Sequence, residues 1–457
     1  MTDHLPNDVE SLQALVKELM QKIAKLEAEN AELRRRLGLN STNSHQPPSS
    51  DGYRKKSVKP GLPKEEKKAN GGQAGHQGDT LKRVEKPDHV IQHLPDRCRR
   101  CGRVFSASEA RIEQSRQVFD LPEPKLEVTE HQIGVVSCCG LEHRGSYPTG
   151  VTGPVQYGSG VKALVTKLSV DHRMPLEQIS QHFEDLYGYA LNTATIESIL
   201  TEAYERAEGI EQQVMAHLQQ EGVVHLDETG IRVGGKLQWL HTASTERYTH
   251  LFIHEKRGTE ALQSEASVLK TFPGTALHDC WSPYFTFDQL RHGLCGAHLL
   301  RELNGLMDNG SVWAEKMHGY LLELHGQPRP IADGEAVRQR YRLILAEADR
   351  EEPPPIPGQR GRPKQAGGRN LMNRLRDYED AVLAFALVPD IPFTNNQGER
   401  DLRPAKVKLK VSGCFRTPSG ARVYARLQAT ISTFRKLAMK VMESLHDLLS
   451  GRTVVLE

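Results

Sequence analysis

The chain has 457 residues, a formal net charge of +2 and a hydrophobic content of 37%, which is low for one compact globule. This length suggests about three structural units, and the near-neutral charge does not by itself indicate a nucleic-acid ligand. There is no run of 18 apolar residues, and the start has neither a basic end nor an apolar core, so we expect neither a membrane span nor a signal peptide.

Residues 9–38, in an N-terminal unit of residues 1–39, predict a long helix. Leucine repeats every seven residues, and a mainly apolar residue follows each leucine by four positions. This pattern is the a/d seam of a coiled coil, and asparagine at one a position favours a parallel dimer in a fixed register. The alternative is an amphipathic helix packed on its own domain; charged residues at the other positions favour the coiled coil, hence a homodimer or higher oligomer. The seam consists of Leu12, Leu19, Leu26 and Leu33 with Val16, Ile23, Asn30 and Leu37.

Residues 40–88 predict a linker, because the composition is polar, basic and glycine-rich and cannot bury a core. Two interpretations stay open. The basic residues could lie along phosphates, or the segment could be a solvated tether.

Residues 89–155 carry a possible metal signal. In an intracellular chain, seven cysteines favour metal ligands or free thiols over disulfides. Cys98 and Cys101 form a CxxC knuckle, and a second cysteine pair follows about forty residues later. The second pair is irregular, since Val136 stands where a strict CxxC needs cysteine. The predicted structural Zn²⁺ ligands are Cys98, Cys101, Cys139 and either Cys138 or His143, in a small zinc-ribbon-like region with short strands at 116–121 and 126–136.

Residues 156–220 predict helices at 159–171, 175–183 and 192–200. Asn192 or Thr193 is a good N-cap for the last helix. The last two helices resemble a helix-turn-helix, whose second helix could enter a DNA major groove, although any helical hairpin gives a similar pattern.

Residues 221–310 and 391–415 predict an α/β core. Strands are expected at 223–226, 230–233, 237–242 and 248–253, with a turn at Gly234-Gly235, a helix at 259–270 and another strand at 275–278. A strand and then a helix are expected within 290–306. Three antiparallel strands, a helix and a strand beside the first is the order of a ribonuclease-H-like sheet.

Three acids occupy the expected ends of these elements. Asp227 and Asp279 end apolar strands, and Glu399 begins a predicted helix. If they converge, their hard oxygen ligands suit Mg²⁺, and two such ions about 4 Å apart can act in an in-line phosphoryl displacement. The alternative for Glu399 is a capping box with Asn396 as the N-cap.

Residues 311–390 predict a charged helical insertion between Asp279 and Glu399. A dense basic stretch follows Glu399 and continues to Lys440 in a C-terminal basic helical region, residues 416–457. A basic stretch beside the third acid is typical of a DNA-binding surface. Its first members are Arg400, Arg403, Lys406, Lys408 and Lys410.

Several phrases in the chain resemble transposases of the insertion-sequence-66 family. They are His225–Thr229, His278–Trp281, Ala297–Leu303, Asn395–Pro404, Asn43–Gly52 and Gly71–His76, with the cysteine knuckles. The chain departs from the family at Val136, and at Gly398, where members commonly have alanine.

The resemblance implies a multidomain DDE transposase with a leucine zipper, a zinc-binding region, a helix-turn-helix-like segment and a ribonuclease-H-like core. The roles of catalytic residue and Mg²⁺ ligand carry over to Asp227, Asp279 and Glu399. The implied partners are the double-stranded DNA of element ends and target, with possible accessory proteins, and the implied place is the bacterial cytoplasm at the nucleoid. The competing hypotheses are a Mg²⁺-dependent nuclease of the same fold and a non-catalytic DNA-binding regulator.

Overall fold

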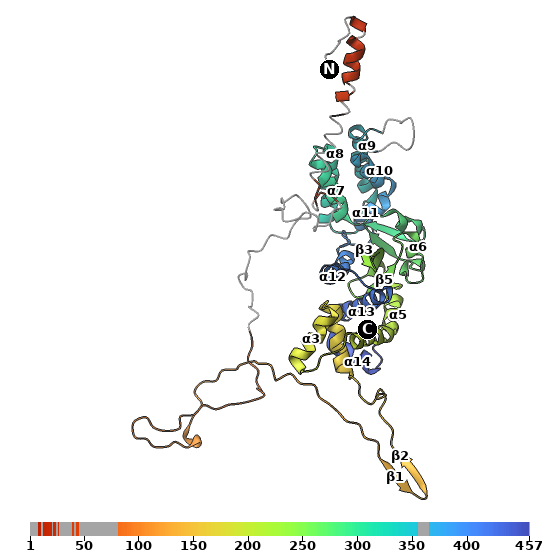
Figure 1. Cartoon of the computed structure of the whole chain (residues 1–457). Coiled ribbons are helices and arrows are strands. Elements are labelled where there is room, and N and C mark those ends of the chain that lie inside the picture. Colours follow the sequence, from red (N-terminus) through yellow and green to blue (C-terminus); the bar gives the residue numbers. More distant parts are fainter. Residues whose placement is uncertain are drawn as a thin grey trace.

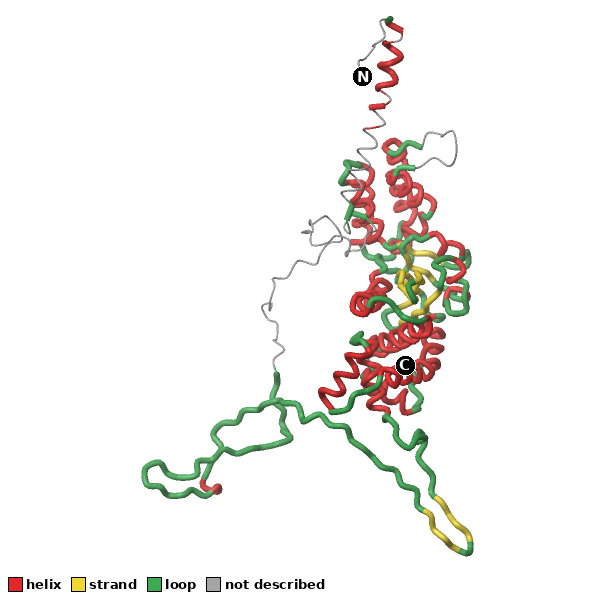
Figure 2. Tube along the Cα trace, in the orientation of Figure 1, coloured by secondary structure: helices red, strands yellow, loops and turns green. Residues whose placement is uncertain are grey.

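The computed structural model describes residues 8–10, 12–20, 22–23, 26, 39–40, 43–44, 81–354 and 365–456. A mixed sheet lies in the middle of the molecule, with helices α7 to α11 on one side and α2 to α5, α13 and α14 on the other (Figure 1). Long loops and one small hairpin extend away from this body (Figure 2). The mixed α/β class predicted for the core is therefore confirmed.

The sheet has five strands in the order β5-β4-β3-β6-β7. The central strand β3 is antiparallel to β4 and parallel to β6, so the expected arrangement of three antiparallel strands with a fourth beside the first is confirmed. The expected strands 223–226 and 230–233 form one continuous strand. Gly234 and Gly235 have φ of +55° and +79°, as a tight hairpin turn requires. The strands are β3 Val223–Val233, β4 Lys236–Ser244, β5 Thr249–His254, β6 Thr275–His278 and β7 Arg291–Leu294.

The single helix predicted over 259–270 is wrong. The structure has a short helix α6, Thr259–Leu262, and a separate 3₁₀ turn, Val268–Lys270. Two serines account for the break. The Ser264 hydroxyl donates to the Ala261 carbonyl, and the Ser267 hydroxyl accepts from the backbone N–H of Leu269, so both compete with continued helix.

The helices before the sheet share one apolar core with the C-terminal helices and one side of the sheet. Asn192 caps α4 by accepting from the Ala194 N–H, as predicted. Helix α13 packs on β5, so this C-terminal helix belongs to the body around the sheet. These helices are α2 Ser159–Thr166, continued by a π-helical turn Lys167–Asp171, α3 Leu176–Tyr187, α4 Thr193–Arg206, α5 Glu208–Leu218, α13 Pro418–Lys436 and α14 Val441–Ser450.

The segment between β7 and the last acid is helical, as expected, and has a second apolar core around Trp313 and Tyr341. After it, α12 returns to pack against β3 and β4. Glu399 therefore lies next to the sheet, although it is 120 positions after Asp279 in the sequence. The helices are α7 Gly296–Met307, α8 Val312–Gly326, α9 Gly334–Glu351, α10 Gly367–Asp377, α11 Glu379–Leu387 and α12 Asn396–Ser412.

The strands predicted at 116–121 and 126–136 are wrong, except that Val135 and Val136 belong to a short strand. The regular strands in residues 81–158 are β1 Val135–Cys138 and β2 Leu141–Arg144, which form a small hairpin. The apolar residues of the predicted strands are solvated instead, with Val118, Leu121 and Val128 exposed by 88%, 90% and 85%. An apolar alternation needs a partner strand and a core to form a sheet, and this segment has neither here.

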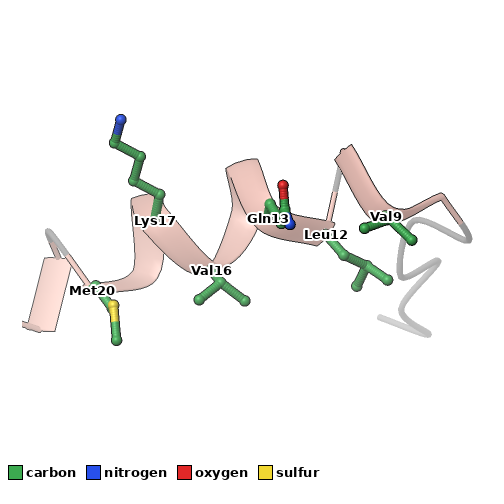
Figure 3. A pocket seen from close by; sticks show the side chains of 6 residues that line it. All are labelled: Val9, Leu12, Gln13, Val16, Lys17 and Met20. Atoms are coloured by element: carbon green, nitrogen blue, oxygen red, sulfur yellow. The ribbon is translucent and has the colours of Figure 1, made fainter.

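The N-terminal helix presents an apolar face to solvent. Val9, Leu12, Val16 and Met20 lie along it beside Gln13 and Lys17, around a shallow hollow (Figure 3). Val16 and Leu19 are about half exposed, at 51% and 47%. The second half of the predicted seam, including Asn30, Leu33 and Leu37, lies outside the described residues, as do linker residues 45–80. No helix in the described part of the chain is long and apolar enough to cross a membrane.

Gly296, at the start of α7, packs closely against Phe393 in the segment before α12, and a substitution can test this packing. The Gly296 N–H donates to the Phe393 carbonyl, 2.8 Å away, and a Cβ on Gly296 would overlap the Phe393 ring. We expect Gly296→Ala to lower the free energy of unfolding by about 1–3 kcal/mol, as overpacking does. Gly209→Ala on α5, where a Cβ has open space, should be neutral or stabilising. Chemical denaturation compares the two, and equal effects would contradict the close packing.

Candidate active site

The register of β3 and β6 brings the first two predicted acids together. His225 pairs with Leu277 in parallel register, so Asp227 and Asp279, each two residues further on, reach the same edge and side of the sheet. The Asp227 carboxylate accepts the Glu228 N–H at 2.8 Å, and the Asp279 carboxylate accepts the Trp281 N–H at 3.1 Å. These bonds orient both carboxylates locally.

Asn395 attaches the start of α12 to the same edge. Its side-chain nitrogen donates to the Leu226 carbonyl at 2.6 Å, and its side-chain oxygen lies 2.9 Å from His225 Nδ1. Its backbone N–H points to the Cys295 sulfur at 3.1 Å. Asn395 is fully buried, and its contacts join β3, the end of β7 and α12. The local sequence did not predict this role.

The capping-box interpretation of Glu399 is wrong. Helix α12 begins at Asn396, and its N-cap is Asn395, which makes no side-chain cap hydrogen bond. The amide of Asn395 is used instead for His225 and Leu226. A reciprocal pair between Asn396 and Glu399 therefore does not form, and the acid is available for another role.

The first turn of α12 lies directly against Asp227. A Cβ on Gly398 would come 3.3 Å from the Asp227 Cβ, so glycine here permits close contact. Glu399 itself faces α7. Its Oε1 lies 3.7 Å from His298 Nε2 and 3.5 Å from an Arg301 nitrogen, and this buried oxygen accepts no hydrogen bond from the described residues.

Asp227 is poorly compensated by positive charge. Burial, followed by the charges of Glu228 and Asp279, raises the pKa of Asp227 to about 8, and Lys406 opposes this only in part. Burial and Asp279 also raise the pKa of Glu228. A desolvated group of hard oxygen ligands suits a divalent cation. Yet within the described ranges no three Asp, Glu, His or Cys side chains are close enough to hold a metal together, because Glu399 is turned towards Arg301 and His298.

Sequence reasoning missed a second charged network on the opposite face of β3. Two Arg257 nitrogens donate to Glu228 Oε1 at 2.9 and 2.6 Å, and the Tyr284 hydroxyl donates to Oε2 at 2.6 Å. The Arg257 guanidinium lies 4.2 Å from the Trp281 ring centroid and 4.8 Å from that of Trp239. Arg257 thus links Glu228, which follows Asp227, to Trp281, which lies two residues after Asp279. Strand alternation identifies Glu228 as facing the other side, but no local pattern identifies Arg257.

The backbone immediately after Asp279 is strained. Cys280 has φ of +75°, in the left-handed region that a non-glycine residue rarely adopts. Its thiol is largely buried, and this burial raises its pKa to about 12, so it is a poor nucleophile. Strain of this kind persists where surrounding structure imposes it, often at functional sites.

The basic residues after Glu399 divide into two groups. Arg403, Lys406 and Lys410 are exposed and follow Glu399 at spacings of four, three and four, so they form one stripe along α12. Arg400 is exposed and approaches Gln397. Lys408 instead lies over the Tyr424 ring, where burial lowers its pKa.

The wider basic surface expected up to Lys440 is not one surface. Arg426 pairs with Glu211, Arg435 with Asp171, and Lys436 with Asp401, so these charges are used within the fold.

The predicted recognition helix α4 has an outer face that is poorly suited to phosphates. Its exposed residues include Glu197 and Glu205, and its basic residue Arg206 pairs with Glu202. Its other face is buried against α2, α13 and α14. The helical pair exists as expected, but its charge does not favour DNA contact.

The predicted zinc ligands are not brought together. The Cys98 N–H donates to the Arg103 carbonyl, and the Gly102 N–H to the Cys98 carbonyl, which closes the first knuckle. Cys138 and Cys139 lie at the turn of the β1–β2 hairpin, in a separate arm of the molecule (Figure 1). The part of the chain that the structure describes therefore gives zinc no support.

Two family models match separate parts of the chain. The sequence model of the family described as Transposase IS66 family matches residues 154–423, which is more than half of the chain. A family of unknown function (DUF6444) matches residues 2–82. No curated protein matches the chain.

Because the pKa of Asp227 is raised, replacing this acid by a neutral residue should stabilise the fold by an amount that depends on pH. Below pH 3.8, its ordinary value, both states are protonated; as the pH rises from there to about 8, the unfolded state ionises while the folded state keeps its proton, so stability falls. In chelator-treated protein, Asp227→Asn should therefore raise the melting temperature more at pH 8 than at pH 5. A pKa difference of one between the two states corresponds to about 1.4 kcal/mol. Asp288→Asn, at an exposed acid, is the control, and a pH-independent difference would contradict the desolvation.

Proposed function

Because the chain belongs to the transposase IS66 family, we propose that it cleaves the ends of a mobile element and transfers the strands into target DNA. Asp227, Asp279 and Glu399 are the catalytic acids in this proposal. The observation that supports it most directly is the register of β3 and β6, which sets two acids on adjacent strand ends. The sheet order and the return of α12 support a ribonuclease-H-like core.

The acids are proposed to hold Mg²⁺. Bound there, Mg²⁺ would supply the charge that activates an attacking oxygen and stabilises the leaving one. Asp227 would give up its proton on binding, since metal ligands must be deprotonated. Glu399 would exchange its contacts with His298 and Arg301 for a place beside the other acids, while Asn395 keeps α12 attached to β3.

Arg403, Lys406 and Lys410 are proposed to bind the DNA backbone. Their stripe begins beside Glu399 and runs along the exposed side of α12, so a phosphate chain along it would lead to the acids. Lys406 is close enough to Asp227 to lower its pKa in part. Arg400 extends the basic surface at the start of the helix, whereas the packing of Lys408 on Tyr424 makes it a weaker candidate.

The N-terminal helix is proposed to join two copies of the chain. Its apolar face is exposed at helical spacing, and a second helix of the same kind would cover it. The transposase would then act as a dimer or a higher oligomer.

The catalytic proposal predicts that charge, and not only shape, matters at the three acids. Asp227→Asn, Asp279→Asn and Glu399→Gln should each slow Mg²⁺-dependent cleavage of element ends by at least about 100-fold, as loss of a charge-stabilising group does. DNA binding should be retained. Glu197→Gln on the outer face of α4 should cut at the normal rate.

Two outcomes separate the competing hypotheses. Cleavage without transfer of pre-cleaved ends would favour a nuclease of the same fold. Wild-type protein that binds the ends but never cuts in Mg²⁺ would favour a regulator, and normal cutting by Glu399→Gln would remove Glu399 from the site.

The DNA-binding proposal predicts a change in salt dependence. Replacing Arg403, Lys406 and Lys410 together by glutamine should flatten the plot of log affinity against log salt by about 0.9 for each phosphate that the protein no longer neutralises. The matched control replaces three exposed arginines on other elements, Arg291, Arg329 and Arg350. If both triple variants keep the wild-type slope, the stripe does not contact DNA.

The dimer proposal predicts that charge on the apolar face separates the copies. Leu12→Glu with Leu19→Glu, or deletion of residues 1–38, should reduce the mass measured by light scattering to that of one chain. Ala14→Glu, at an exposed position outside the seam, should leave the mass unchanged. A double variant that keeps the wild-type mass would show that another surface joins the copies.

A further inference from the structure

A short segment from the N-terminal region lies against the end of α7 (Figure 1). Asn43 is 6% exposed although the chain around it is polar. Its side-chain nitrogen donates to a carboxylate oxygen of Asp308, the C-cap of α7, at 2.9 Å. The two residues are 265 positions apart in the sequence, so this contact is tertiary.

The segment is folded into a turn that presents Asn43. The Asn40 N–H donates to Asn43 Oδ1 at 2.8 Å, and the Asn43 N–H donates to the Asn40 carbonyl at 3.3 Å. The Ser44 hydroxyl donates to the same carbonyl at 2.6 Å. The two ends of the Asn43 amide therefore have different roles, since the oxygen closes the turn and the nitrogen binds Asp308. An aspartate could not replace it, because its charge would face a carboxylate.

Gly305 on α7 is shaped for the same contact. A Cβ there would lie 2.5 Å from the Asn43 carbonyl oxygen, which is closer than such atoms can approach. Glycine within a helix is unfavourable for the helix itself. The close approach of another backbone gives the physical reason for its presence here.

We propose that Asn40, Asn43 and Ser44 form an internal docking motif, and that the last turn of α7 with Gly305 and Asp308 is its receptor. The motif anchors the segment that follows the exposed apolar helix at a fixed point on the body. That point is on the helix whose first half carries His298 and Arg301, the partners of Glu399. The docking does not depend on the transposase proposal.

The sign of a stability change tests the proposal in the full-length chain. Gly305→Ala should lower the melting temperature, because the added methyl group collides with the docked backbone. If no other segment packed against the last turn of α7, the same change would raise the melting temperature by removing a helical glycine. Gly319→Ala on α8, where a Cβ meets nothing within 4 Å, is the matched control and should raise it.

Hydrogen exchange reports on the motif directly. The backbone N–H groups at positions 40 and 43 should exchange at least about tenfold faster in Gly305→Ala, in Asn43→Ala and in Asp308→Ala. A tenfold change corresponds to about 1.4 kcal/mol in the opening equilibrium. They should be unchanged in Gly319→Ala. Asn43→Ala and Asp308→Ala combined should have less than the sum of their separate effects on the melting temperature. A rise in the melting temperature of Gly305→Ala with unaltered exchange, or additive effects of the pair, would overturn the proposal.

Discussion

The candidate site depends on one buried amide, that of Asn395. Its side chain spans two neighbouring residues of β3, and its backbone N–H reaches Cys295 at the end of β7. Because the amide is both donor and acceptor, and is almost completely buried, losing it would remove a buried hydrogen-bond partner of two groups of β3, the His225 ring and the Leu226 carbonyl. The contacts also fix where α12 starts. Gly398 then lies against Asp227, and Glu399 faces α7 one residue later.

The electrostatics of this edge oppose the stability of the fold. Burial with the charges of Glu228 and Asp279 raises the pKa of Asp227, and burial with the charge of Asp279 raises the pKa of Glu228. Arg257 and Tyr284 compensate Glu228 on one face of β3, but Asp227 on the other face has only the partial influence of Lys406. Such an arrangement of buried acids does not stabilise the fold. The same arrangement suits a site whose positive charge arrives with a ligand. The strained backbone at Cys280, beside Asp279, belongs to the same edge.

The N-terminal region has two kinds of contact surface. Its helix leaves an apolar face in solvent, whereas Asn43 is held by a hydrogen bond and a close backbone approach at α7. An apolar face is non-specific and suits a second copy of itself, while a turn fitted to a glycine and a carboxylate recognises one site. The proposed dimer contact and the proposed attachment to the body would thus belong to separate segments of the N-terminal region.

Features that depend on local pattern could be predicted from the amino-acid sequence. Hydrophobic periodicity predicted a mixed α/β core, and the succession of its elements suggested the strand order of a ribonuclease-H-like sheet. Glycines at 234 and 235 predicted the hairpin, and acids at strand ends were the reason for choosing Asp227 and Asp279. Tertiary structure decided what depends on partners distant in the chain. The apolar alternation at 116–134 found no partner strand and stayed solvated, and the two cysteine pairs were not brought together. The charge of Lys436 was used by Asp401, while that of Lys406 stayed exposed. Asn395, Arg257 and Gly305 have no distinctive local pattern, because each is defined by residues that only the folded chain brings to it.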